Sequence, residues 1–80
     1  MQIEEAIGTR LRELCEERNI TLSGLATKAG IHHTTVLRIC NGKGKEIKPR
    51  TLEKLLDALG MQPRQFYDSV MFEHVDRVND

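Results

Sequence analysis

The sequence predicts an all-α domain of five helices, and three observations support this fold class. The 80 residues include only two Phe, one Tyr and no Trp, and runs of β-branched residues are rare, which disfavours a sheet. Apolar residues recur at helical spacing along most of the chain. Glycine and proline separate these stretches where helices end or begin. Because a chain of this size buries only about 60% of its unfolded surface, we expect one domain over residues 1–80. Within it we expect a core at 1–68 and a helical extension at 69–80.

The first predicted helix runs from Ile3 to Arg18. Its apolar residues form one helical face and are Ile3, Ile7, Leu11, Leu14 and Cys15. Gly8 lies within this helix and weakens it by up to about 1 kcal/mol relative to Ala. We expect the helix to serve as a scaffold that covers the next two helices with its apolar face.

The stretch from Thr21 to Gly42 predicts two short helices joined by a tight turn. Thr21 is a good N-cap for a helix over Leu22–Ala29, because its hydroxyl can accept a bond from a first-turn amide. Gly30 suits the left-handed backbone that ends this helix. The second helix covers His33–Asn41, with Val36, Ile39 and Cys40 on its inward face. Two helices joined by a few residues that include Gly are what a DNA-reading helix-turn-helix requires.

Two further helices follow, and each has a proline near its start. Pro49 fits the first position of the fourth helix, where its missing N–H is no loss. Its packing residues are Leu52, Leu55, Leu56 and Leu59, and Gly60 ends it. Gln62-Pro63 starts a fifth helix in the same way, and Phe66 closes the core.

The tail after Phe66 has apolar residues at helical spacing, namely Tyr67, Met71, Val75 and Val78. Two interpretations compete for this stripe. It either packs on its own domain or forms a two-fold contact with a second copy of the chain. A homodimer would place two reading helices about 34–36 Å apart, which matches successive major grooves.

The segment LATKAGIHHTTVLRICNGK resembles the helix-turn-helix of phage repressor and Cro-type regulators, the xenobiotic-response-element family. The matching features are Leu25-Ala26 before Gly30, and Asn41-Gly42 at the end of the second helix. PRTLEKLLDALGM resembles the fourth helix of this family, and the likeness covers about residues 3–68. The resemblance implies a lambda-repressor-like domain that binds duplex DNA of specific sequence and regulates transcription, more often as a repressor.

The same resemblance implies which residues contact bases. They lie on the first turn of the helix that starts at His33 and one turn later, and are His33, Thr34, Leu37 and Arg38. Arg38 can donate two hydrogen bonds to guanine O6 and N7, and Leu37 or the Thr34 methyl can touch a thymine methyl. The alternative for Arg38 is a surface charge that pairs with Glu46 or a phosphate. The polar face of the first helix is expected to make no base contact.

Charge is distributed unevenly along a chain whose formal net charge is zero. Residues 28–50 hold six basic residues and one acid, a balance of +5, so the remainder sums to −5. The expected phosphate contacts are Thr21, Leu22 (through its N–H), His32, Thr35, Asn41, Lys43, Lys45, Lys48 and Arg50. If five phosphates are neutralised, a plot of the logarithm of the binding constant against the logarithm of the salt concentration would have a slope of roughly −4 to −5. The alternative is a solvated, lysine-rich loop.

Cys15 and Cys40 stand where many members of the family carry an Arg and a Glu that pair across the packed helices. Replacing only one member would leave a buried charge unpaired, so the paired replacement is physically consistent. We expect the two sulfurs to lie close together and buried, as small apolar groups. A disulfide stays open as an alternative.

Other function classes find little support. The sequence has no catalytic constellation, so we expect neither an enzyme nor a cofactor. His32 and His33 point about 100° apart on a helix, which disfavours a metal site. No apolar run of membrane length or signal peptide is visible, which predicts a cytoplasmic protein. The alternative function is a protein-interaction module on the same fold, such as an antitoxin or regulator subunit, which Leu22, Leu37 and the neutral net charge favour.

Overall fold

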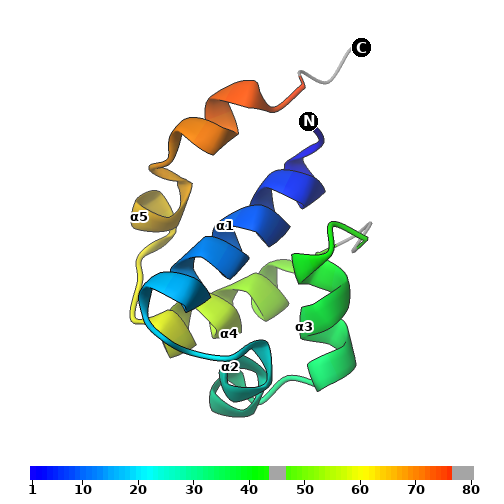
Figure 1. Cartoon of the computed structure of the whole chain (residues 1–80), viewed down its shortest axis with the longest axis vertical. Coiled ribbons are helices and arrows are strands. Elements are labelled where there is room, and N and C mark those ends of the chain that lie inside the picture. The colour runs from blue at the N-terminus through cyan, green and yellow to red at the C-terminus, as the bar shows by residue number, and fades with distance from the viewer. Residues whose placement is uncertain (44–46, 77–80) are drawn as a thin grey trace.

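The computed structural model of the chain describes residues 1–43 and 47–76, and in this part every regular element is helical. The elements are α1 (Ile3–Glu17), α2 (Leu22–Ala29), α3 (His33–Cys40), α4 (Pro49–Leu59), α5 (Pro63–Tyr67) and the 3₁₀ helix η1 (Val70–His74). Figure 1 shows α1 in the middle of the molecule, with α3 on one side and α5 and η1 on the other. The predicted all-α fold of five helices is confirmed.

The core forms where α1, α2, α3 and α4 meet, and α5 covers one end. Its fully buried large side chains are Leu11, Leu25, Val36, Leu55 and Phe66. Phe66 closes the core as the sequence predicts, and Arg10 fixes α5 to α1. The Arg10 Nε donates to the carbonyl oxygen of Phe66 at 2.9 Å. This hydrogen bond joins α5 to α1 across 56 positions of sequence.

The helix boundaries follow local chemistry. The Thr21 hydroxyl accepts a hydrogen bond from the Gly24 amide at 2.9 Å, which confirms the predicted N-cap. Gly30 and Gly60 end α2 and α4 at φ 71° and 66°, in the left-handed region that glycine adopts without steric cost. The helices expected to end at Arg18 and Asn41 end one residue earlier, and these two residues are their C-caps.

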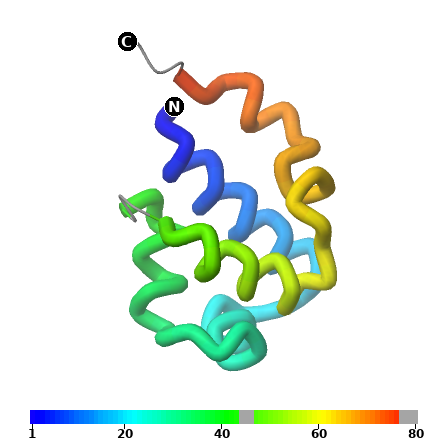
Figure 2. The backbone as a smooth tube through the Cα atoms, turned by 180° about the vertical axis from the view of Figure 1, so that it is seen from behind, coloured from blue at the N-terminus to red at the C-terminus, as the bar shows by residue number. Residues whose placement is uncertain are grey.

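The tail packs back on its own domain and is not one continuous helix. Ser69 is extended, with φ −151° and ψ 139°, so α5 stops before η1 begins. The Phe72 ring lies 4.9 Å from that of Tyr67 and 5.8 Å from that of Phe66, measured between centroids. Figure 2 shows η1 beside α1, and the Asp76 amide donates to the Met1 carbonyl oxygen at 2.8 Å. Val78 of the predicted stripe lies outside the described residues.

None of the helices over residues 1–43 and 47–76 combines the length and the apolar character that crossing a bilayer demands.

Candidate nucleic-acid interface

The helix-turn-helix predicted from Thr21 to Gly42 is present as α2 and α3. After Gly30, the Ile31 amide donates to the Ala26 carbonyl oxygen at 3.0 Å, which closes the turn between the two helices. α3 then packs through Val36, Ile39 and Cys40, which are 0%, 4% and 4% exposed. Because these three residues face the core, the opposite face of α3 is turned outward (Figure 1).

The residues expected to contact bases lie on that outward face. His33, Thr34 and Arg38 are exposed, and Leu37 is half-buried. Thr34, Arg38 and Asn41 follow one another at spacings of four and three residues, so they form one row along the helix. All three side chains of the row are exposed to solvent.

The residues expected to contact phosphates come from three places. Thr21 and Leu22 start α2, His32 and Thr35 flank the start of α3, and the remainder follow α3 or start α4. All of those that the structure describes are exposed except Leu22 and Thr35, which are half-buried; the exposed ones are Thr21, His32, Asn41, Lys43, Lys48 and Arg50. Lys45 lies outside the described residues.

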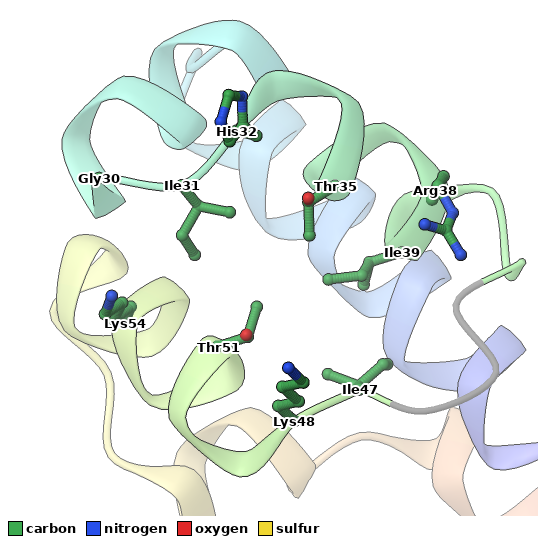
Figure 3. Close-up of a pocket in the computed structure, with 10 residues that line it drawn as sticks. All are labelled: Gly30, Ile31, His32, Thr35, Arg38, Ile39, Ile47, Lys48, Thr51 and Lys54. Carbon is green, nitrogen blue, oxygen red and sulfur yellow. The ribbon is translucent and has the colours of Figure 1, made fainter.

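A cleft of about 740 Å³ lies between α3 and the start of α4, and Figure 3 shows its walls. Ile31, Ile39 and Ile47 supply apolar side chains, while hydroxyl and cationic side chains surround them. The ten lining residues include no acid and are Gly30, Ile31, His32, Thr35, Arg38, Ile39, Ile47, Lys48, Thr51 and Lys54. The cleft therefore brings His32, Thr35, Arg38 and Lys48 of the predicted set to one surface, and this surface suits an anion.

Sequence reasoning missed Lys54, which lines the same cleft. The signal was present, because Thr51 and Lys54 are three residues apart and share one face of α4. Finding it required knowing which face of α4 turns toward α3.

Cys15 and Cys40 are both buried, at 3% and 4% exposure, and both are free thiols. Burial, and then the nearby Cys15, raise the pKa of the Cys40 thiol from 9.0 to about 11, against the opposing effect of Arg12. Burial also raises the pKa of Cys15. Both thiols are therefore neutral near pH 7 and act as apolar groups between α1 and α3, as expected.

Two residues of α1 that sequence reasoning did not connect with α3 lie directly against its end. A Cβ on Gly8 would overlap the Ile39 carbonyl oxygen and lie 3.0 Å from the Cys40 carbonyl oxygen. The Arg12 Nε donates to the Cys40 carbonyl oxygen at 3.0 Å, and its Nη2 donates to Asn41 Oδ1. Gly8 therefore permits a close approach of the two helices, and Arg12 fixes the end of α3.

A metal site needs several ligating side chains that converge on one point. Over residues 1–43 and 47–76, no three His, Cys, Asp or Glu side chains gather closely enough to hold an ion.

The chain is similar to known DNA-binding domains in sequence and in structure. The family model of the Cro/C1-type HTH DNA-binding domain matches residues 10–71. The HTH-type transcriptional repressor RghR of Bacillus subtilis (strain 168) is 36% identical over 78 residues, which cover 95% of this chain and 55% of RghR. The uncharacterized HTH-type transcriptional regulator RghRB of the same organism is 42% identical over 52 residues, which cover 65% of this chain and 37% of RghRB. The chain thus spans about half the length of RghR and less of RghRB.

Among solved structures, the restriction-modification controller protein C.AhdI from Aeromonas hydrophila superposes with a TM-score of 0.73 at 27% sequence identity. The match covers 79% of this chain and 94% of that one. The family model covers more than three quarters of the residues, and the glycine turn, the capped α2 and the outward face of α3 are all in place. The chain belongs to the family of Cro/C1-type helix-turn-helix DNA-binding domains.

Proposed function

We propose that this chain binds duplex DNA of specific sequence and regulates transcription as a repressor that occupies its operator. The observation that carries the proposal is the exposed row of α3 beside a cleft whose lining holds cations and no acid. Membership of the family supports it. RghR, which is 36% identical, is named a transcriptional repressor, and C.AhdI is a controller protein of restriction and modification.

In this proposal α3 enters the major groove and its outward side chains read base edges. Arg38 donates two hydrogen bonds to guanine O6 and N7, a pairing worth about 1–3 kcal/mol of discrimination. His33 and Thr34 contact neighbouring bases, and the exposed part of Leu37 lies against a thymine methyl.

The phosphate backbone is held on both sides of α3. The N-terminus of α2, with Thr21 and the Leu22 amide, faces one phosphate, because helix N-termini favour anions. Lys48 and the other predicted cations contact the rest together with the polar side chains of His32 and Thr35, and Lys54 joins them from the cleft wall. Lys45 belongs to this proposed set although it lies outside the described residues. These contacts position the protein and carry no base information of their own.

The proposal also includes a homodimer formed through the tail. Tyr67 and Val70 expose 39% and 72% of their surface, and Met71 and Val75 beside them are half-buried. Two copies joined there would present two α3 helices to half-sites about 34–36 Å apart. Light scattering after size exclusion tests this: we expect twice the mass of the chain for the wild type and the monomer mass for Val70→Glu. A monomeric wild type, free and on DNA, would contradict the dimer and leave the reading helix in place.

The DNA part is tested by selecting duplexes from a random pool and measuring affinity by fluorescence anisotropy at several salt concentrations. Arg38→Ala is expected to weaken binding by about 1–3 kcal/mol and to relax the preference at one base position. Lys48→Ala is expected to weaken binding to all sequences equally and to make the salt slope shallower by about 0.9. Arg64→Ala is the matched control, because it removes one charge from α5, on the other side of α1 from α3 (Figure 1).

Three results would count against the proposal. Binding that is independent of salt would favour the protein-interaction function. Equal losses for Arg38→Ala and Arg64→Ala would show that only net charge matters. An unchanged sequence preference in Arg38→Ala would remove that residue from base reading.

A further inference from the structure

Arg12 of α1 lies against the C-terminal end of α3 and holds two acceptors there. Its Nε donates to the Cys40 carbonyl oxygen at 3.0 Å, and its Nη2 donates to the side-chain oxygen of Asn41. The three amides that follow in the described part of the chain, those of Asn41, Gly42 and Lys43, donate to the carbonyl oxygens of Leu37, Ile39 and Arg38 respectively. Arg12 therefore supplies a donor for the last carbonyl of α3, and its charge suits the negative end of the helix dipole.

The second bond fixes which way the Asn41 amide faces. A guanidinium has only donors, so the amide group that meets it must present its oxygen. The NH₂ of Asn41 is consequently turned away from Arg12. Asn41 is exposed and stands seven residues after Thr34, on the outward row of α3.

Resting on the proposed function, we propose that Arg12 is a positioning residue for DNA binding. It holds the amide of Asn41 so that the NH₂ donates a hydrogen bond to a DNA phosphate. A phosphate offers acceptors only, so an Asn41 side chain rotated by 180° would set two acceptors against each other. Arg12 acts through Asn41, and α1 itself touches no base.

The Arg12–Asn41 pair allows a substitution that separates positioning from folding. Asn41→Asp has nearly the same shape and keeps an acceptor for Arg12, now with charge assistance. It removes both N–H donors and places a negative charge at the phosphate. We expect this variant to melt near the wild-type temperature, because the charge-assisted bond to Arg12 offsets the unfavourable carboxylate at the C-terminal end of α3. Its affinity for the selected duplex should fall about tenfold or more.

A double-mutant cycle then tests whether Arg12 acts through Asn41. Arg12→Gln should weaken binding several-fold in the wild type and have little further effect in Asn41→Ala, because the amide it positions is gone. Arg12→Lys, which retains the charge with a single point of donation, should fall between the wild type and Arg12→Gln. Equal factors for Arg12→Gln in both backgrounds would overturn the proposal, because Arg12 would then act on DNA directly or through the stability of α3. Wild-type affinity in Asn41→Asp would overturn it as well.

The contact itself is tested without DNA. In a ¹H–¹⁵N spectrum of the free protein, Arg12→Gln should shift the two side-chain NH₂ signals of Asn41. The corresponding signals of Gln2, the N-cap residue of α1, should not move. Unmoved Asn41 signals would overturn the positioning role whatever the DNA result. If Arg12→Gln shifts the Asn41 signals but the wild type has no affinity for any duplex, the phosphate contact is overturned together with the proposed function.

Discussion

Gly8→Ala tests the packing of α1 against α3, because the close contact predicts that this substitution lowers the free energy of unfolding instead of raising it. In an exposed helix this substitution stabilises by about 1 kcal/mol, because Ala has the higher helix propensity. Here Gly8 is buried, and the added Cβ would overlap the carbonyl oxygen of Ile39 and lie 3.0 Å from that of Cys40. Both atoms belong to the backbone of a helix, so neither can swing aside as the end of a side chain could.

The magnitude follows from two opposing terms. Overpacking a close contact costs about 1–3 kcal/mol, and the rigidity of a helix backbone places this contact at the upper end. Subtracting the propensity gain of about 1 kcal/mol leaves a net loss of about 2 kcal/mol. For a domain of this size such a loss lowers the midpoint of thermal unfolding by about 8–16 °C.

Circular dichroism during heating measures that midpoint, and Gly24→Ala is the matched control. A Cβ on Gly24 would lie 3.1 Å from the Thr21 hydroxyl oxygen, the end of a side chain that can rotate. Loss of this cap and the gain in propensity are each about 1 kcal/mol, so we expect almost no net change. A Gly8→Ala protein that melts at or above the wild-type temperature would refute the close approach of α1 and α3.

Three further predictions concern stability. Thr21→Ala removes the hydroxyl that accepts from Gly24 and should cost about 1 kcal/mol in denaturant unfolding, whereas Thr21→Ser should cost much less. Phe66→Ala empties a fully buried site and should cost about 3–5 kcal/mol by the same method; a loss under 1 kcal/mol would contradict its place in the core. Because the pKa of Cys40 is raised to about 11, its neutral form stabilises the fold below pH 9, and this contribution is lost as the pH rises from 9 to 11. The melting temperature of Cys40→Ala should therefore fall less over that interval than that of the wild type, and equal falls would contradict the shift.

The sequence predicts the helices well because their signals are local. A Thr hydroxyl caps its own helix, Pro49 starts α4, and the glycines at 30 and 60 take a left-handed backbone beside the residues they terminate. Such features need no knowledge of the partners across the core.

What the sequence did not predict depends on how helices cross. From the sequence alone, Gly8 is a residue of low helix propensity. Only the close approach of α3 shows why a side chain is excluded at this position. Arg12 and Lys54 are ordinary surface cations by pattern, and their roles follow from which face of α1 or α4 is turned toward α3. In the tail the apolar spacing predicted a helical extension at 69–80. The described part of it holds the short 3₁₀ helix η1 after the extended Ser69, and a backbone change of this kind leaves no mark on the apolar pattern.

The packing of α1 against α3, which buries the thiols of Cys15 and Cys40 in place of charged groups, has a practical consequence. Over residues 1–43 and 47–76 no charged side chain is buried, and the ion pair between Met1 and Asp76 lies at the surface. Added salt screens the interactions of exposed charges and has little effect on buried apolar contacts. We therefore expect high ionic strength to dissociate the protein from DNA without unfolding it. Lowering the salt concentration again should restore binding.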